Sequence, residues 1–318
     1  MSGAMPAGAR ESSIGTTVAR PRRRRRGGLQ RRRELTGVAM ALPAVFVLSV
    51  FFLLPLVLTF WISLHTWPLL GNHVWAGLAN YTRALHDQEF RTALRFTVEY
   101  TLFTTPVLFL LGLGLAILIR RRTRAAAAFQ TVYFLPVVIG FASASFLFKF
   151  LFQGGVGQAI SLLARVGITS NNTNWFAGPL SALTIVIGMV TWKFVGLQML
   201  LLLTGLQGIP IEVQEAAKID GASRWGNFRF VTLPLLRPTL ALVLVFSVAG
   251  SLLAFDQFYI MTNGGPENST ITAVYEIYRV SFIKFQLGYG AALSVILMVI
   301  LAIVSAVQLL LLRNSDNG

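Results

Sequence analysis

The sequence predicts an all-α membrane protein with six transmembrane helices and both termini in the cytoplasm. Three observations predict this fold class. Of the 318 residues, 55% are hydrophobic and only 12% are charged, which is about half the charged share of a soluble domain. Six apolar segments are long enough to cross a bilayer, which takes roughly 20 residues. The Lys and Arg residues are concentrated in every second connection between these segments.

The N-terminal segment, residues 1–36, is rich in arginine and poor in large apolar side chains, and ten of the 27 cations lie in it. We expect a disordered cytoplasmic tail that touches anionic lipid and does not bind nucleic acid. A basic stretch followed by an apolar one is also typical of a secretory signal peptide. The apolar stretch that follows is much longer than the core of a signal peptide, about 7–15 residues, so we interpret it as a retained span.

The six predicted spans form one transmembrane domain over residues 37–312, and a short cytoplasmic tail follows at residues 313–318. Helices are predicted because backbone in lipid must satisfy its own hydrogen bonds, and the alternation that is typical of barrel strands does not occur. The predicted spans cover residues 37–64, 94–119, 129–152, 180–206, 238–262 and 289–312.

The distribution of positive charge orients these spans. With the N-terminus in the cytoplasm, the inner segments hold 19 Lys and Arg residues and the outer loops hold 5. Loops that carry an excess of Lys and Arg remain on the cytoplasmic side. The sequence therefore predicts that both termini and the connection at residues 207–237 face the cytoplasm.

Several kinds of chemistry are excluded by the residues. The chain has no cysteine, which excludes disulfides and thiolate sites. The spacing of His65, His73 and His86, with Asp87, fits no recurring metal-ligand pattern. No Gly-Lys dipeptide occurs, so the chain lacks the phosphate-binding loop of an ATPase. We expect no catalytic residue, no metal and no cofactor bound by this chain.

The connection at residues 207–237 contains a helical pattern that is unusual for a loop between spans. Gly221 indicates a bend, and the helical spacing over residues 211–222 is carried by Ile211, Gln214, Glu215, Lys218, Ile219 and Ala222. Ser223 is a candidate N-cap for a second short helix. Such a segment can rest on lipid as an amphipathic helix or dock on another protein, and the pattern alone leaves both open.

Eight residues of this connection match a family pattern at the proper spacing: Glu215, Ala216, Ala217, Asp220, Gly221, Ala222, Leu233 and Pro234. The pattern resembles the EAA loop in the membrane subunits of binding-protein-dependent ABC importers, with Val231 in place of the usual isoleucine. Residues 255–300 and 77–85 also resemble carbohydrate-importer permeases, in particular the first permease subunit of the maltose and glycerol-phosphate type. The resemblance covers about residues 37–312.

The resemblance implies a type I importer permease fold in the cytoplasmic membrane of a prokaryote. It implies alternating-access uptake of a sugar or sugar-like solute, for example an oligosaccharide, a polyol or glycerol phosphate. In that family the position of Glu215 contacts an ATPase, Ala216 and Ala217 pack closely, and Gly221 bends the loop. The implied partners are a second homologous permease in a heterodimer, two copies of a cytoplasmic ATPase that uses ATP and Mg, and an extracytoplasmic solute-binding protein.

Polar residues in the spans are candidates for the substrate path, because polar groups in a membrane are costly and typically functional. Sugar sites combine aromatic rings with amides, carboxylates and hydroxyls. The candidates are Trp192, Lys193, Gln198, Ser251, Asp256, Gln257 and Tyr259. An ion pair between Lys193 and Asp256 would explain two of them without any substrate.

Two other classes of function fit the sequence less well. A self-contained secondary carrier should show internal repeats and carboxylates for coupling ions near the membrane midplane, and neither is clear in the sequence. A membrane scaffold without transport activity would not need the EAA pattern.

Overall fold

The structure, a computed structural model, describes residues 27–120 and 123–313. Most of the predicted N-terminal tail and residues 314–318 of the predicted C-terminal tail lie outside the described residues. The chain divides into two compact units, Met1–Pro55 and Leu56–Gly318.

The first unit is helical throughout its described part. Helix α1 (Gly27–Leu48) continues through a π-helical turn, η1 (Ser49–Leu53), into α2 (Leu54–Ser63), which extends into the second unit. Helix α1 therefore includes residues 27–36, which we had predicted to be disordered. Most of this segment consists of Leu, Gln, Arg and Glu, which favour helix, and the two glycines, Gly27 and Gly28, lie only at its start. Residues Ala39–Ser63 are long and apolar enough to span a membrane.

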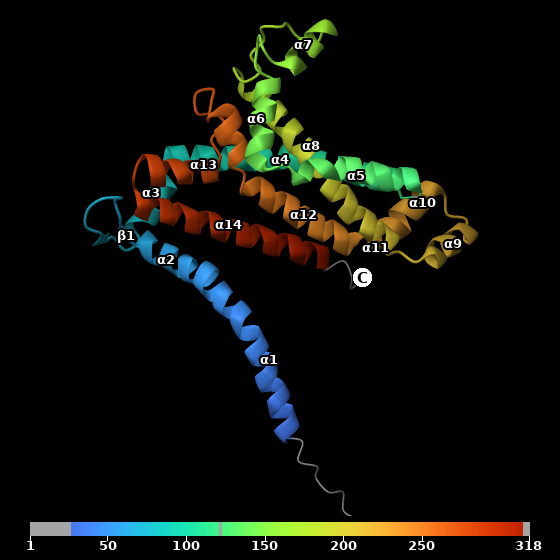
Figure 1. Cartoon of the computed structure of the whole chain (residues 1–318), viewed down its shortest axis with the longest axis horizontal. Coiled ribbons are helices and arrows are strands. Elements are labelled where there is room, and N and C mark those ends of the chain that lie inside the picture. The colour runs from blue at the N-terminus through green and yellow to red at the C-terminus, as the bar shows by residue number, and fades with distance from the viewer. Residues whose placement is uncertain (1–26, 121–122, 314–318) are drawn as a thin grey trace, which may run out of the picture. The chain divides into compact units, whose positions relative to one another are not determined.

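The second unit consists mainly of long apolar helices (Figure 1). Three of them are continuous: α4 (Gln88–Leu118), α8 (Pro179–Gln207) and α14 (Leu287–Arg313). Two further candidates are bent pairs, α5 (Arg124–Val138) with α6 (Phe141–Leu151), and the segment Arg224–Leu235 with α12 (Arg237–Leu252). Together with Ala39–Ser63, the described residues hold four helices that could cross a membrane, or up to six if each bent pair is one span.

Two of the predicted continuous spans are interrupted in the structure. The predicted span at residues 129–152 bends by 95° between α5 and α6. Pro136 lacks a backbone N–H near the end of α5, and Gly140 has an extended backbone with ψ 142°. The predicted span at residues 238–262 leaves the helix after Leu252, before the π-helical turn η3 (Phe258–Thr262). The prediction missed both breaks because it considered the length of each apolar run, although Pro136 and Gly140 are local signals of the first break.

Short elements connect the spans at the predicted outer end. The two-residue strands β1 (His65–Thr66) and β2 (Val74–Trp75) pair antiparallel, with His65 opposite Trp75. They are followed by α3 (Ala79–His86), and later in the chain come α7 (Gln158–Arg165), α13 (Ala273–Tyr278) and the π-helical turn η4 (Arg279–Ile283). Figure 1 shows β1, α3 and α13 at the opposite end of the second unit from α9 and α10.

Helix α8 is the centre of the second unit. It packs against α4, α5 and α12, and 56% of its most apolar stretch is buried, against 17% for α14. Gly196 allows α8 to approach α5 closely, since a Cβ there would lie 1.9 Å from the carbonyl oxygen of Tyr133. These contacts fix α5 against the helix that runs through the core.

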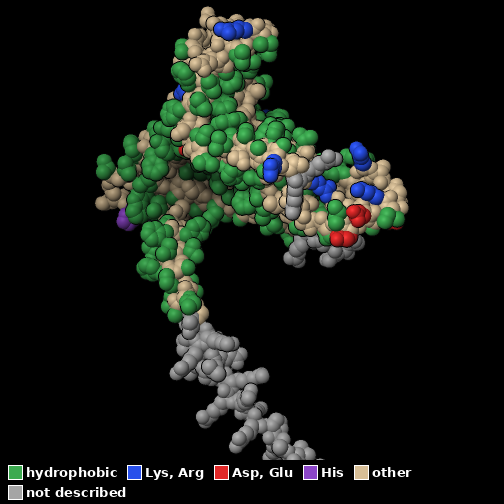
Figure 2. All heavy atoms as spheres, turned by 45° about the vertical axis from the view of Figure 1, so that its right-hand side comes forward, with side chains coloured by type: hydrophobic (Ala, Val, Ile, Leu, Met, Phe, Trp, Pro, Cys, Tyr) green, Lys and Arg blue, Asp and Glu red, His purple; other side chains and the backbone are tan. Residues whose placement is uncertain are grey.

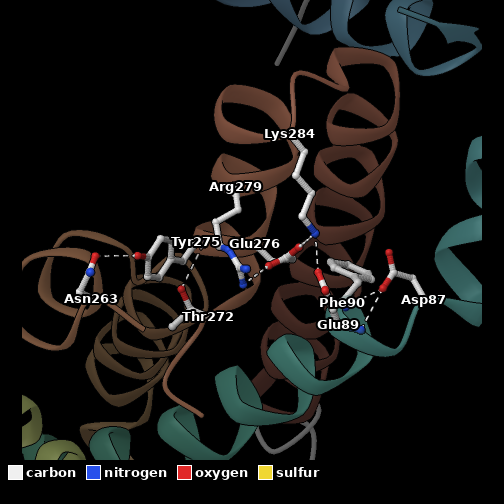
Figure 3. Close-up of polar contacts among 9 residues, drawn as sticks. All are labelled: Asp87, Glu89, Phe90, Asn263, Thr272, Tyr275, Glu276, Arg279 and Lys284. Atoms are coloured by element: carbon white, nitrogen blue, oxygen red, sulfur yellow. Dashed lines mark hydrogen bonds and ion pairs between the residues drawn. The ribbon is translucent and has the colours of Figure 1, made fainter. Parts of the chain in front are cut away.

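A polar cluster joins α13 and η4 to the start of α4 (Figure 3). The Glu276 carboxylate is 1% exposed and accepts hydrogen bonds from Arg279 and Lys284, each at 3.1 Å. The Lys284 ammonium also forms an ion pair with the Glu89 carboxylate on α4. Burial raises the pKa of Glu276. Burial alone would lower the pKa of Lys284, but its bonds to the two carboxylates raise that pKa overall. The cluster fixes the predicted outer end in one arrangement.

Candidate functional site

The EAA loop, residues 207–237, is built from short helices. Helix α9 (Ile211–Ile219) ends with Asp220 as its C-cap, and Gly221, the next residue, adopts a left-handed backbone with φ +81°. The N–H of Gly221 donates to Lys218 O at 3.0 Å, and the N–H of Ala222 donates to Ala217 O at 2.9 Å. This is the Schellman arrangement, in which glycine satisfies the last carbonyls of a helix. The predicted bend at Gly221 is confirmed.

A second short helix follows the bend. Helix α10 (Arg224–Asn227) begins after Ser223, whose Oγ accepts a 3.0 Å hydrogen bond from the N–H of Gly226. The predicted N-cap is thus confirmed. The Asn227 side chain donates to Gln214 O at 3.3 Å and so ties α10 to α9. A π-helical turn, η2 (Phe228–Thr232), and α11 (Leu233–Leu235) then lead into α12. The bend is therefore held by hydrogen bonds on both sides.

The EAA loop exposes large apolar side chains next to charged ones. Ile219, Trp225 and Phe230 are 85%, 67% and 74% exposed. Of the eight residues that match the family pattern, the exposed ones are Glu215, Ala216, Asp220 and Gly221, and the half-buried ones are Ala217, Ala222, Leu233 and Pro234. Charged side chains gather over this end of the molecule, whereas hydrophobic side chains cover most of the surface elsewhere in the view (Figure 2). Such a mixed and rigid face is suited to contact with another protein.

A cavity of about 410 Å³ lies among α4, α6, α8 and α12. Aromatic rings and small polar groups line it together. The aromatic residues are Tyr100, Phe141, Phe194 and Phe246, and the polar ones are Gln198, Ser247, Ser251 and Gln257. Aliphatic side chains complete the wall. This combination provides flat apolar faces and hydrogen-bonding groups in one partly open cavity.

The polar groups of the cavity are held by one another. The Gln198 amide on α8 donates to the Ser247 hydroxyl on α12, and Ser247 donates to Val243 O at 2.7 Å. The Gln257 amide donates to the Tyr100 hydroxyl at 3.3 Å. The Gln198 Oε1 atom is buried and has no hydrogen-bond partner among the residues that the structure describes. A buried acceptor of this kind is costly unless a ligand or water satisfies it.

The structure brings three of the seven candidates for the substrate path together. Gln198, Ser251 and Gln257 line the cavity. Four others lie elsewhere. Trp192 packs against Phe148 with ring centroids 5.3 Å apart, Asp256 is exposed, Tyr259 stacks on Phe255 at 5.3 Å, and Lys193 contacts the break between α5 and α6. Within the described part of the chain, no ion pair joins Lys193 to Asp256.

Sequence reasoning missed all four aromatic residues of the cavity wall. Tyr100, Phe141, Phe194 and Phe246 each lie in an apolar segment in which aromatic residues are common. One signal existed, because Phe194 and Gln198 are four residues apart and therefore share a helix face. Packing between the helices decides which face of each helix lines the cavity, and the sequence of a single helix does not specify that packing.

The three loop histidines do not form a metal site in the structure. His65 and His73 belong to an aromatic cluster near β1, with Trp67 stacked on His73 at 4.4 Å. Over residues 27–120 and 123–313, no group of three or more His, Cys, Asp and Glu residues could hold a metal ion.

Comparison with known proteins gives consistent matches over most of the chain. The family described as binding-protein-dependent transport system inner membrane component matches residues 108–315. The lactose transport system permease protein LacF of Rhizobium radiobacter is 33% identical over 291 residues, which is 89% of this chain and 96% of LacF. The arabinooligosaccharides transport system permease protein AraP of Bacillus subtilis is 34% identical over 271 residues, 84% of this chain and 85% of AraP.

The fold also occurs in a solved structure. A chain of a bacterial ABC transporter involved in the import of the acidic polysaccharide alginate superposes with a TM-score of 0.77. The match covers 90% of this chain and 98% of the other at 20% sequence identity. At this identity the likeness establishes a shared fold and nothing about the solute.

Proposed function

Because this chain belongs to the family of binding-protein-dependent transport system inner membrane components, we propose that it carries a sugar or sugar-like solute across the membrane. In this proposal it is one permease subunit of an ATP-driven importer that works by alternating access. It has no ATPase site of its own, and a partner subunit binds and hydrolyses ATP with Mg. LacF and AraP are named for the transport of sugars, which supports this class of solute.

The observation that carries the proposal is the chemistry of the cavity. Sugars present hydroxyl groups at their edges and C–H groups on their faces, so they suit a site with amides, hydroxyls and aromatic rings. Gln198, Ser251 and Gln257 supply the polar groups, and Phe141 and Phe194 supply ring faces. The cavity lies among α4, α6, α8 and α12, four helices of the proposed membrane domain.

The EAA loop is the proposed docking site of the ATPase. Its two short helices are locked by the Gly221 bend and by the bond from Asn227 to Gln214 O. A stiff element can transmit movement of a partner to the helices behind it, and α12 follows directly. The exposed Trp225 and Phe230 give the contact apolar area, and Glu215 gives it charge.

The proposed topology has six spans with both termini in the cytoplasm of a prokaryote. The bent pair of α5 and α6 then counts as one span, α12 belongs to another, and the EAA loop, which includes the segment Arg224–Leu235, lies inside. Two ATPase copies would bind at this side, one to this chain and one to a second homologous permease in a heterodimer. The solute-binding protein would bind at the other end, where α3 and α13 lie (Figure 1).

Uptake measurements test the role of the cavity. In the complete transporter, Phe194→Ala should raise the KM for sugar uptake about tenfold, equivalent to ~1.4 kcal/mol, because a ring face is lost. The matched control is Phe103→Ala on α4, a ring that is 58% exposed and lies outside the cavity lining. Lactose and arabinooligosaccharides are the first sugars to assay. An unchanged KM for a transported sugar in Phe194→Ala would contradict the assignment of the cavity.

Co-purification and uptake test the docking site. Glu215→Ala and Gly221→Ala should remain inserted in the membrane but retain less ATPase and lose uptake. Alanine at residue 221 must adopt a left-handed backbone, which costs about 1–2 kcal/mol. Gly221→Asn is the matched control, since asparagine tolerates this conformation. Full ATPase retention and full uptake in both alanine variants would indicate that the loop rests on lipid instead.

A further inference from the structure

Lys193 lies midway along α8, yet its side chain reaches the break between α5 and α6. It is 3% exposed. Its ammonium donates to three backbone carbonyl oxygens at the end of α5: those of Pro136 at 3.4 Å, Val137 at 3.3 Å and Ile139. Its other neighbours are the rings of Phe141 and Phe194, with the Nζ atom 5.6 Å and 5.4 Å from their centroids.

These carbonyls need a donor because the chain turns away from the helix. The last four carbonyls of a helix have no intrahelical partner, and in the membrane there is no water to satisfy them. The chain leaves the helix at the 95° bend between α5 and α6, where Pro136 O accepts the N–H of Ile139 at 3.2 Å and the Lys193 ammonium is a further donor to the carbonyls of Pro136, Val137 and Ile139. A cation at this point also interacts favourably with the negative end of the helix dipole. Lys193 therefore stabilises the broken form of the span.

The buried charge of Lys193 is not explained by any acidic residue in the described part of the chain. Among the residues that the structure describes, no carboxylate lies within ion-pair distance of Lys193. A lysine in the middle of a membrane helix is costly, and a continuous span at residues 124–151 would give it no carbonyl to bind. The buried Lys193 ammonium thus needs the carbonyls at the break as acceptors, and the break is stabilised by the ammonium.

The close approach of two backbones brings the ammonium within reach. Gly196 is one turn from Lys193 on α8, and a Cβ at residue 196 would lie 1.9 Å from Tyr133 O. At this point α5 and α8 touch backbone to backbone. The end of α5 consequently lies beside Lys193.

The break has a direct effect on the cavity. Phe141 is the first residue of α6 and lines the cavity, as does Phe194, the neighbour of Lys193 on α8. If the span straightened, α6 would swing and Phe141 would move with it.

We propose that Lys193 is a positioning residue for transport: its ammonium holds the break between α5 and α6 and so fixes Phe141 in the cavity wall. The inference rests on the proposed sugar cavity for its effect on uptake, whereas its effect on the bend stands independently.

Distance measurement between two spin labels tests the bend. The chain has no native cysteine, so Ala128→Cys on α5 and Phe150→Cys on α6, both exposed, label specifically in a complex whose other subunits are cysteine-free. At about 1.5 Å per residue the two backbone positions are roughly 22 Å apart across the bend and roughly 33 Å apart in a straight helix. Lys193→Met should lengthen or broaden the label distance by at least about 3 Å.

Uptake by the same variants distinguishes positioning from general stability. Lys193→Met should raise the KM for sugar uptake about tenfold while the complex still assembles, and Lys193→Arg, which can donate to the same carbonyls, should restore both KM and distance in large part. Lys149→Met is the matched control, because Lys149 on α6 donates to Ile260 O at 2.8 Å, away from the break. It should change neither value.

The label distance and the KM of the variants together decide whether the proposal holds. An unchanged distance in Lys193→Met overturns it. A lengthened distance with an unchanged KM supports the role in the bend and contradicts the sugar cavity. If the complex with Lys193→Met does not assemble, Lys193→Gln replaces it. Glutamine keeps an N–H donor, but its side chain is too short to reach all three carbonyls. Lys193→Gln should therefore lengthen or broaden the label distance by less than Lys193→Met. No change in distance in that variant overturns the proposal equally.

Discussion

The contact between α5 and α8 gives the sharpest test of the packing. In Gly196→Ala, the new Cβ would lie 1.9 Å from Tyr133 O and 2.4 Å from Tyr133 C. An ordinary C···O contact is about 3.3 Å, so the two backbones must separate by about 1.4 Å. Overpacking of this kind costs about 1–3 kcal/mol, and the better helix propensity of alanine returns at most about 1 kcal/mol. After subtraction of that full gain, the expected net loss is about 0–2 kcal/mol.

Gly188 provides a matched control in the same helix. A Cβ at residue 188 meets no atom within 4 Å, so Gly188→Ala should be neutral or slightly stabilising. The assay is reversible unfolding by sodium dodecyl sulfate in mixed micelles, which reports the free energy of unfolding of each variant. If Gly196→Ala and Gly188→Ala unfold with equal free energies, the backbones of α5 and α8 do not touch as described.

Two further predictions concern the predicted outer end. Asp87 caps α4, and its carboxylate accepts hydrogen bonds from two backbone N–H groups and from the Tyr289 hydroxyl. Burial raises the pKa of Asp87, but these bonds lower it overall below the ordinary 3.8. Its stabilising effect should therefore be complete above pH 3.8 and lost as the pH falls through the lowered value. Thermal melts should show this loss of stability at low pH in the wild type but not in Asp87→Asn. Asp87→Ala should lower the free energy of unfolding by about 1 kcal/mol at pH 7. Thr272 is fully buried and donates to Ala254 O at 2.6 Å, so Thr272→Val should cost about 1–3 kcal/mol in unfolding assays. Thr184→Val, which removes an exposed hydroxyl on α8, should cost much less.

The EAA loop could be predicted closely because its signals are local. A left-handed glycine, a serine N-cap and helical spacing all lie within a dozen residues, and each has a fixed conformational meaning. The structure confirms the bend at Gly221 and the cap at Ser223. What the loop contacts remains a proposal.

The cavity could be predicted only in part. Gln198 and Ser251 were identified because polar residues are rare in apolar segments, whereas Phe141 and Phe194 resemble the many rings that face lipid. Lys193 was identified for the same reason as Gln198. Its partners are backbone carbonyls, which carry no sequence identity, so no pattern could reveal them.

The sequence by itself determined that the chain is an apolar helical membrane protein with a patterned EAA loop. Composition and the length of the apolar runs determine the class of protein, and turn signals within a few residues determine the shape of the loop. The tertiary structure alone decided where the spans break and which helix faces enclose the cavity. Lys193 bonds to a carbonyl 54 residues away in the sequence, and Gln198 bonds to Ser247, 49 residues away. Such pairs form only when α8 packs between α5 and α12, and that packing depends on side-chain shape and close backbone approach that no single segment specifies.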